Sequence, residues 1–398
     1  MATAKKKAKA GPIVGYGILC VLLLAFLIAT LVGSWLQGSS LIGDKAFLAA
    51  AQEYFKKSPR MISQEDLNSI AYLKVTDSAV YFGDETVLTS ALSGDSDSEL
   101  GTSVNLTADL NDFAGDLALL QGLKYFASSA KAYTSDLSVL KGVASLEHLN
   151  LDDAKGNDLS AVSELTSLKT LSLNRVSIAD PSALKGLSGL ETLSINGTGI
   201  DDLSVVGAKG IKKLSATGNG ISSLKALSGF ADLEEIDVSD NDILSLSGVE
   251  GLSKLKSLNV NSNAKIEDLS PLSGLSALET LNADGAAVKD LSPLSSLKAL
   301  TALSLDGDQV EDVAPLTGLT TLTSLNLCEN RVSDVSPLAA LTELTTLNLE
   351  GNPVEDWSKL DALTCEIVGK PESEEPVEEE TEEQVVEEET QTETSENN

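Results

Sequence analysis

The sequence predicts an α/β solenoid, in which a curved parallel β-sheet lines the concave face and 3₁₀ turns with extended chain form the convex side. A unit of about 22 residues recurs ten times between Leu149 and Leu360. Each unit opens with leucines that alternate with small polar residues, which is the period of a strand with one buried face. The rest of each unit leaves no room for a long helix. Units too small to bury their leucines alone bury them by stacking, which gives a solenoid.

The expected strands are placed by ten hydrophobic residues in register. The first inward-pointing residues of the repeats are Leu149, Leu171, Leu193, Leu214, Ile236, Leu258, Leu281, Leu303, Leu325 and Leu347. In the ninth repeat, Leu325 and Leu327 are expected to point into the core, while Asn326 and Cys328 point out.

An asparagine lies five residues after this first strand position in half of the repeats. These residues are Asn219, Asn241, Asn263, Asn330 and Asn352. A buried amide there can satisfy backbone groups of its own turn and of the neighbouring repeat. The other repeats carry Ala154, Val176, Thr198, Ala286 and Asp308 at this position. We therefore expect a slightly irregular solenoid, whose turns in those repeats need water or other partners.

The returning half of each repeat contains a turn signal. Asp-x-Ser-Pro-Leu occurs at Asp268, Asp290 and Asp334, where Asp favours the turn and Pro presets φ. The full pattern, L-x-x-L-x-L-x-x-N-x-[IV], is the leucine-rich-repeat signature. With the ending N-x-[IV]-x-D-[LV]-S-P-L at 330–338, the chain resembles bacterial surface proteins of the internalin type with 22-residue repeats. The resemblance covers about residues 62–370 and implies a secreted or surface-held protein that binds another macromolecule.

Degenerate repeats precede the clear ones, as expected for a cap. Residues 62–148 predict this N-terminal cap, which opens with a helix capped by Ser63 and a first strand around Leu73. Residues 104–140 read as two degenerate repeats, and the segment 93–103 reads as an exposed loop.

The clear repeats end in a second cap and a tail. Residues 149–360 hold the ten leucine-rich repeats, and 361–370 predict a last short strand that closes the stack. Residues 371–398 contain 13 Glu and neither Lys, Arg nor an aromatic residue, so we expect a disordered acidic tail.

The N-terminus predicts a membrane anchor. A basic segment, 1–12, precedes an uncharged apolar stretch, 13–36, with Tyr16 and Trp35 near its ends. Its 24 residues cover roughly 36 Å as a helix, enough for a bilayer core of about 30 Å. A cleaved signal peptide is the alternative, but its apolar region is shorter. Residues 37–61 then predict a stalk or linker helix, with part of the cap as the alternative role.

The charge distribution sets the expected topology and partners. Lysines crowd the residues before the apolar stretch, so the positive-inside rule leaves the N-terminus in the cytoplasm and the repeats outside. Of the total formal charge of −32, the tail contributes −13 and the leading lysines +4, so residues 10–370 still carry −23. This charge opposes nucleic-acid binding and favours basic partners or cations. Plain solubility of a secreted surface is the alternative explanation.

The concave face is the expected binding surface, and two columns of outward-pointing residues cover it. The first column lies between the paired strand residues and comprises Asn150, Ser172, Ser194, Ser215, Asp237, Asn259, Asn282, Ser304, Asn326 and Asn348. The second column lies two positions further on and comprises Asp152, Asn174, Asn196, Thr217, Ser239, Asn261, Asp284, Asp306, Cys328 and Glu350.

From these columns and their flanks we select candidate binding residues by polarity and charge. They are Asp152, Arg175, Asp237, Asn259, Asn282, Asp284, Asp306, Asn326, Asn348 and Glu350. Aromatic anchors, which usually carry protein-interface energy, are missing from both columns. Aromatic residues gather instead at Tyr125, Phe126 and Tyr133, where cap core and binding patch are the two alternatives.

No signature of catalysis, cofactor binding or a metal site occurs in the sequence. The single histidine, His148, is expected to be a surface residue. The alternating acids Asp95, Asp97 and Glu99 lack the glycine and final Glu of an EF-hand loop, so we read them as a solvated loop. Cys328 and Cys365 lie about two strands apart, too far for a disulfide.

Together these features predict a single-pass protein of the cell membrane, bacterial by its resemblance, that is not an enzyme. Its repeats would bind a protein or glycan outside the cell, as in adhesion. One alternative is an envelope spacer whose acidic tail makes the contacts. Another, if the topology is reversed, is an intracellular membrane-tethered scaffold.

Overall fold

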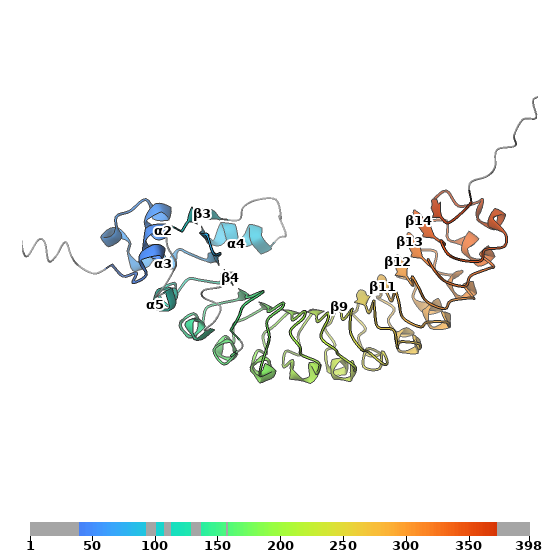
Figure 1. Cartoon of the computed structure of the whole chain (residues 1–398), viewed down its shortest axis with the longest axis horizontal. Helices are drawn as coiled ribbons and strands as arrows, with labels where there is room; N and C mark the ends of the chain where they lie inside the picture. The colour runs from blue at the N-terminus through green and yellow to red at the C-terminus, as the bar shows by residue number, and fades with distance from the viewer. Residues whose placement is uncertain (1–39, 93–100, 107–112, 129–136, 157, 372–398) are drawn as a thin grey trace, which may run out of the picture.

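The computed structural model describes residues 40–92, 101–106, 113–128, 137–156 and 158–371 of the 398-residue chain. These residues form an arc whose inner, concave side is lined by strands and whose outer side carries short helices (Figure 1). Fifteen strands make one sheet, and from β4 onward they follow one another in chain order. The fold is the leucine-rich-repeat solenoid that the 22-residue period predicts.

The ten clear repeats supply strands β5 to β14, each three residues long. Their bounds are β5 His148–Asn150, β6 Thr170–Ser172, β7 Thr192–Ser194, β8 Lys213–Ser215, β9 Glu235–Asp237, β10 Ser257–Asn259, β11 Thr280–Asn282, β12 Ala302–Ser304, β13 Ser324–Asn326 and β14 Thr346–Asn348. Parallel pairing places the first inward-pointing residue of each repeat beside its equivalent in the next repeat, as Leu325 beside Leu347. These ten side chains are at most 3% exposed, so stacking does bury what one repeat could not.

The convex side consists of 3₁₀ helices and turns, as the short units require. The 3₁₀ helices are η2 Leu137–Gly142, η3 Val162–Glu164, η4 Pro181–Gly186, η5 Leu203–Val205, η6 Lys225–Gly229, η7 Ser270–Leu272, η8 Ser292–Ser296, η9 Ala314–Leu316, η10 Ser336–Ala340 and η11 Trp357–Leu360. The turn-forming Asp before a helix accepts a backbone hydrogen bond two residues on, as Asp268 Oδ1 does from Ser270 N at 2.8 Å.

The repeat asparagines form a buried ladder under the turns. Asn263, with no exposed surface, donates from Nδ2 to the carbonyls of Val238 (3.0 Å) and Val260 (2.8 Å), and its Oδ1 accepts from Ile243 N at 3.0 Å. In repeats without Asn, the turn finds other partners. The Thr198 hydroxyl donates to the Ile195 carbonyl at 2.9 Å, and Asp308 Oδ1 accepts from Val288 N at 2.9 Å.

The N-terminal cap is more elaborate than two degenerate repeats. It contains α2 Lys45–Phe55, η1 Pro59–Met61, α3 Gln64–Asn68, β1 Tyr72–Val75, β2 Ala79–Gly83, α4 Glu85–Leu92, β3 Thr102–Asn105, α5 Phe113–Leu117 and β4 Tyr125–Ser128. Ser63 and Asp66 form the expected capping box of α3. Strand β1 runs parallel to β4 but antiparallel to β2, which pairs antiparallel with β3. The prediction of two repeats over 104–140 is therefore wrong at its start, because β3 is the edge of an antiparallel meander.

Helix α2 packs into the core of this cap. Phe47 is fully buried, and its ring lies 5.7 Å from that of Phe82 and 4.9 Å from that of Phe113. The buried Asp116 carboxylate accepts hydrogen bonds from Gly43 N at 2.6 Å and Asp44 N at 2.7 Å. Of the two roles left open for this helix, its buried face places it in the cap rather than in a free stalk.

A second, smaller apolar cluster lies on the other face of the cap sheet, beneath α4. Tyr72 and Leu88 are buried in it, and Tyr125 is half-buried with its ring stacked on Tyr72 at 4.7 Å. Burial raises the pKa of Tyr72 to about 12. Phe126, one residue further along β4, points into the main core. The aromatic residues of the cap thus serve packing on both faces, while Tyr133 lies outside the described residues.

The solenoid closes with β15 Glu366–Val368, the short last strand expected over 361–370. Its inward residue Ile367 is only half-buried, so this cap is thinner than the N-terminal one. The predicted segments 1–12 and 13–36, the acidic loop residues from Asp95 to Glu99, and the tail from residue 372 lie outside the described residues. Within the described ranges, no helix has the length and apolar character needed to cross a membrane.

Candidate functional site: the concave face

Three residues after each of the strands β5 to β14, a residue with left-handed backbone conformation turns the chain out of the sheet. Glycine takes this position in five repeats, and its non-glycine occupants are Asp153, Arg175, Asp240, Ser262 and Glu329, with φ between 51° and 63°. Arg175 therefore sits on the rim of the concave face. Its guanidinium makes a forked pair with Asp153, with Nε and Nη2 each 2.7 Å from a carboxylate oxygen. This hydrogen bonding lowers the pKa of Asp153.

The backbone N–H of every second-column residue is hydrogen-bonded to a side chain, and the first column decides which one. Where the first column carries Asn or Asp, that side chain accepts from the N–H of its own repeat, as Asn282 Oδ1 does from Asp284 N at 3.0 Å. The same bond forms at Asn150, Asp237, Asn259, Asn326 and Asn348. This is the short-range turn that Asn and Asp side chains favour.

Where the first column carries Ser, the N–H is satisfied across repeats instead. The acceptor is the second-column side chain of the preceding repeat, as when Asn174 N donates to Asp152 Oδ1 at 2.9 Å. The same bond joins Asn196 N to Asn174 Oδ1, Thr217 N to Asn196 Oδ1 and Asp306 N to Asp284 Oδ1. A serine hydroxyl is too short to replace the Asn oxygen, so the neighbouring repeat supplies it.

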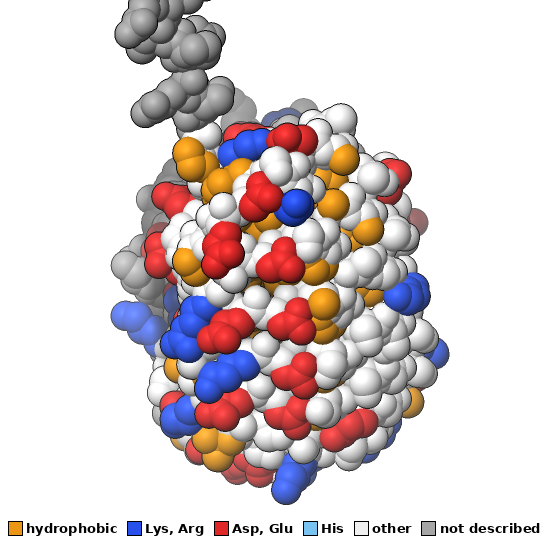
Figure 2. Space-filling view, turned by 90° about the vertical axis from the view of Figure 1, so that its right-hand side faces the viewer, with side chains coloured by type: hydrophobic (Ala, Val, Ile, Leu, Met, Phe, Trp, Pro, Cys, Tyr) orange, Lys and Arg blue, Asp and Glu red, His pale blue; other side chains and the backbone are white. Residues whose placement is uncertain are grey.

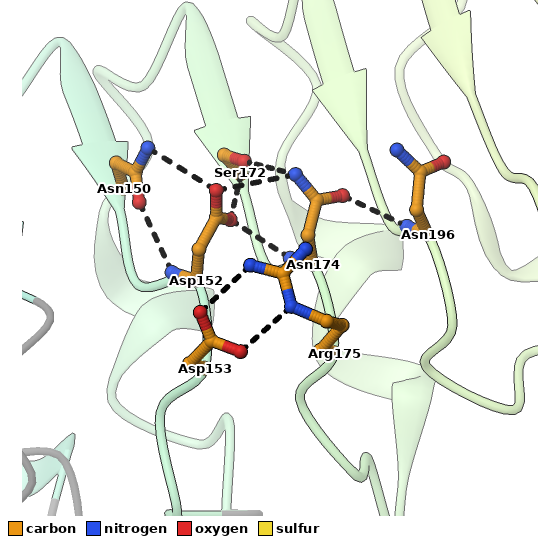
Figure 3. A network of polar contacts seen from close by, with 7 residues as sticks. All are labelled: Asn150, Asp152, Asp153, Ser172, Asn174, Arg175 and Asn196. Carbon is orange, nitrogen blue, oxygen red and sulfur yellow. Dashed lines mark hydrogen bonds and ion pairs between the residues drawn. The ribbon is translucent and has the colours of Figure 1, made fainter.

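Serines at the first-column position of three successive repeats, Ser172, Ser194 and Ser215, therefore create a closed polar network over β5 to β8. Figure 3 shows the part of it from Asn150 to Asn196. The hydroxyl of Ser172 donates to Asp152 at 2.6 Å and that of Ser194 to Asn174 at 2.7 Å, while Asn174 Nδ2 returns to Asp152 Oδ2 at 3.2 Å. In this part of the face the side chains are hydrogen-bonded to one another. The cost of unpairing them leaves little capacity for a ligand.

The pattern reverses over β10 to β14, where the first column is mostly asparagine. Asn259, Asn282 and Asn348 each use Oδ1 within their own repeat. The Nδ2 groups of these three residues donate to no other described residue. Because Asn259 and Asn282 are register neighbours on β10 and β11, their open amide donors lie side by side on the face.

A shallow hollow of about 510 Å³ lies at the middle of the concave face, across β7 to β11. Small side chains such as Ser194 and Ser215 form its floor, and Asn259 and Asn282 line its C-terminal side. Lys213 and Glu235, which are neighbours on β8 and β9, form an ion pair of 2.7 Å in its lining. Both side chains are about half exposed, so the pair adds little stability and can yield to a partner.

Acidic side chains dominate the electrostatics. Figure 2 shows them in a band along the side seen from the C-terminal end, with Lys and Arg gathered beside them. Next to the strands, lysines and glutamates alternate from repeat to repeat and pair, as Lys212 with Glu191 at 2.6 Å and Lys256 with Glu234 at 2.7 Å. These exposed pairs cancel locally and leave the second column as the negative element of the face.

The remaining reactive side chains near the face are the imidazole of His148 and the thiols of Cys328 and Cys365. The His148 ring is half-buried, 6.3 Å from that of Tyr125, rather than lying on the open surface as expected. Burial lowers its pKa, so the imidazole is neutral at physiological pH. Cys328 and Cys365 are free thiols, and burial raises the pKa of both. No group of acidic, His or Cys side chains in the described part of the chain is arranged to hold a metal ion.

The structure places the ten candidate residues along the whole face rather than at one point. Asp152 belongs to the closed network, and Arg175 is paired on the rim. Asp237, Asn259 and Asn282 meet at the hollow. The remaining candidates, Asp284, Asp306, Asn326, Asn348 and Glu350, continue from it toward the C-terminal end. Their role in binding stays a prediction.

Sequence reasoning missed the residues that close the network, above all Ser172, Ser194 and Ser215. The signal was present, because the first column changes from serine to asparagine along the chain. It could be interpreted only once the structure showed which oxygen reaches which N–H.

Comparisons with known proteins identify the repeats and the fold. The family model "Leucine Rich repeats (2 copies)" matches residues 232–274 and 320–362. No curated protein matches the chain. A crystal structure of an internalin (inlF) from Listeria monocytogenes is similar, with a TM-score of 0.64 and 23% identity over 83% of this chain and 96% of that one.

Plant receptors share the fold over a smaller part of their length. The ectodomain of the Arabidopsis thaliana receptor kinase GASSHO1/SCHENGEN3 gives a TM-score of 0.53 at 18% identity, over 64% of this chain and 36% of that one. The plant peptide hormone receptor RGFR1 gives 0.50 at 20% identity, over 62% and 43%. The comparisons therefore show leucine-rich repeats at 232–274 and 320–362, in a solenoid whose fold is similar to that of a Listeria internalin.

Proposed function

We propose that this chain is a cell-surface interaction protein, anchored by residues 13–36, that presents its solenoid outside the cell to bind a protein or glycan, as in adhesion. The observation that carries the proposal is the concave face itself. It is a rigid, polar, curved sheet over ten repeats, with open amide donors and a hollow at its centre. Extended concave surfaces of this kind are what repeat solenoids use for binding.

The structural neighbours support a macromolecular partner. The RGFR1 structure is a complex with RGF2, and the GASSHO1/SCHENGEN3 ectodomain is in complex with CASPARIAN STRIP INTEGRITY FACTOR 2. Both show the fold acting as a binding module in those proteins. The proposal for this chain is likewise a binding module and not an enzyme.

The N-terminal sequence supports the anchored topology. Lysines before the apolar stretch 13–36 favour a cytoplasmic N-terminus, and the stretch is long enough to span a bilayer. The first described residues, at the start of α2, are hydrogen-bonded into the cap through Asp116. In an anchored protein this contact would hold the solenoid close to the membrane, because few residues lie between the stretch and the cap.

Binding by intact cells tests the adhesion part of the proposal. Cells that express the full chain are expected to retain fluorescent matrix proteins or envelope polysaccharides that control cells release. Failure to retain any of them, with the chain shown to be at the surface, would contradict adhesion.

The acidic tail motivates one alternative, a spacer whose tail makes the contacts. Its 13 glutamates follow the solenoid directly. Deleting residues 371–398 separates the two functions. A chain that binds through its concave face keeps its partner, whereas a spacer that binds through its tail loses it.

A further inference from the structure

The concave face divides into a closed part and an open part. On β5 to β8, the side-chain oxygens of Asp152, Asn174 and Asn196 accept hydrogen bonds from backbone N–H groups of the next repeat. On β10 to β14 this bridge is made once, from Asp284 to Asp306 N, because Ser304 is the only serine in that stretch of the first column. The other second-column side chains of this part accept no backbone N–H from the following repeat.

Open hydrogen-bond donors accumulate on the open part. Asn259, Asn261, Asn282 and Asn348 are half-buried, and within the described structure their Nδ2 groups have no acceptor. Their oxygens are fixed by backbone or hydroxyl donors, so the amide planes are held in place. A fixed amide with an unused N–H pair is a preorganised donor for a carbonyl oxygen.

The same part of the face is uniformly negative. On β10 to β14, the two columns carry the carboxylates Asp284, Asp306 and Glu350 and neither Lys nor Arg. The Asp306 and Glu350 carboxylates accept no backbone N–H of the next repeat, in contrast to that of Asp152. The Asp306 carboxylate is hydrogen-bonded only to the side chain of Cys328 among the described residues of that repeat. A concave surface lined by one sign of charge concentrates its field on the approaching ligand.

We propose that the concave face of β10 to β14 is the docking surface for an extended, Lys- and Arg-bearing segment of a protein partner. This inference rests on the proposed binding function and assigns its location and ligand class. Peptide carbonyls accept from the amide row, and the cationic side chains pair with Asp306 and Glu350. Adjacent strands lie about 4.8 Å apart, so a chain that crosses them meets a new row of polar groups at each repeat. The columns carry no aromatic side chain, so charge and backbone recognition take the place of an apolar anchor.

Binding of a synthetic probe to the full chain in detergent micelles tests the proposal. The probe is a fluorescent dodecapeptide of alternating Lys and Ser, and a Glu–Ser peptide and a neutral dextran are the comparison ligands. We expect anisotropy to report binding of the Lys–Ser peptide alone. Asp306→Asn with Glu350→Gln should weaken that binding about fivefold, as expected for losing two solvent-accessible charge pairs.

A matched control separates local charge from overall acidity. Glu267→Gln with Glu355→Gln removes two exposed charges in the segments that lead to η7 and η11, away from the concave columns. This variant should bind the Lys–Ser peptide as the wild type does. An equal loss in both double variants would overturn the proposal, because the whole acidic surface would then be responsible.

Asn282→Ser tests the amide row without changing the charge. Serine at this position allows Asn261 Oδ1 to take over the N–H of Asp284, as Asp152 does for Asn174, so the open repeat becomes a closed one. Peptide binding should fall while far-ultraviolet circular dichroism stays unchanged. Unchanged peptide affinity would overturn the role of the amides.

The comparison ligands distinguish failure of this inference from failure of the proposed function. Binding of dextran without binding of the Lys–Ser peptide would overturn the basic segment and leave a glycan-binding solenoid. Absence of all probe binding would also overturn the inference, and the retention of matrix or envelope components by intact cells would still decide the proposed function.

Discussion

Asp308 occupies a position that the fold builds for asparagine. Its Oδ1 accepts from Val288 N at 2.9 Å, just as Asn330 Oδ1 accepts from Val310 N at 2.9 Å. In Asn330 the other terminal atom, Nδ2, donates to the Leu305, Leu327 and Cys328 carbonyls. In Asp308 that place is taken by Oδ2, which is buried and finds no partner in the described residues. A proton on Oδ2 would restore the donor.

The environment of Asp308 favours this protonated form. Burial raises the pKa of its carboxyl to about 7 from the ordinary 3.8, and the nearby Asp284 and Asp306 carboxylates act in the same direction. Because the folded state holds the proton more tightly, the contribution of Asp308 to stability is full below pH 3.8. It is lost as pH rises through about 7.

Asp308→Asn should therefore stabilise the protein at pH 8 by about 1–3 kcal/mol and leave stability at pH 4 nearly unchanged. Denaturant unfolding of both proteins across this pH range measures the difference. The reverse change, Asn330→Asp, is a matched control that should introduce the same loss of stability at high pH. Parallel pH profiles for wild type and Asp308→Asn would contradict the assignment.

The turn-forming aspartates that precede the convex 3₁₀ helices respond to pH in the opposite direction. Hydrogen bonds from Ser side chain and backbone lower the pKa of Asp268, Asp290 and Asp334 below 3.8. Their contribution is present above pH 3.8 and is lost as pH falls through the lower folded values. Asp268→Asn, which keeps an acceptor but cannot titrate, should flatten the acid arm of the unfolding profile. An unchanged acid arm would show that this turn does not contribute to acid unfolding.

At the scale of elements, a buried carboxylate of α5 fastens the start of α2 within the N-terminal cap. Asp116 is 3% exposed and accepts from the backbone of Gly43 and Asp44 immediately before the helix. Asp116→Ala removes both acceptors and leaves two N–H groups without them. We expect a loss of about 3 kcal/mol in the cap, because hydrogen bonds to a buried charge are strong.

Limited proteolysis near residues 40–61 is the readout for this change, since loosening α2 exposes its sequence before the repeats unfold. The exposed Asp201→Ala is the control, and it should leave the cleavage rate near that of the wild type. Equal cleavage of the two variants would mean that α2 does not depend on the Asp116 carboxylate.

The elements that repeat were predictable from sequence, and those that occur once were not. The 22-residue period placed all ten repeat strands by their first inward-pointing hydrophobic residue, because stacking imposes the same inward position on each unit. The cap offers no such repetition. The antiparallel strands β2 and β3 and the packing of α2 depend on single contacts, such as Phe47 with Phe82, that join distant parts of the chain.

The candidate site was predictable only in part, for a related reason. Alternation along a strand determines which residues face outward, so both columns were read from sequence. Their hydrogen bonding was not, because it depends on whether a side chain reaches its own N–H or the next repeat's. Asp152 accepts the backbone N–H of Asn174 in the next repeat, whereas Asp306 does not accept that of Cys328. This contrast arises from serine or asparagine at the following first-column position.

At the scale of the whole molecule, a polar concave sheet, an acidic surface and an apolar N-terminal stretch point to one use. The solenoid buries a continuous core, and its two ends differ, with a packed cap toward the N-terminus and a thin one toward the tail. In the proposed anchored protein, the concave face would extend away from the packed N-terminal cap. That geometry suits a protein that is attached at one end and binds along its length.

Protease treatment of intact cells, with an epitope placed after Asn398 and lysed cells as control, tests this topology most directly. An extracellular solenoid predicts that the epitope and the repeats are lost from intact cells while cytoplasmic markers survive. Protection of the epitope until the cells are lysed would contradict surface display and place the repeats in the cytoplasm, where the chain would act as a membrane-tethered scaffold.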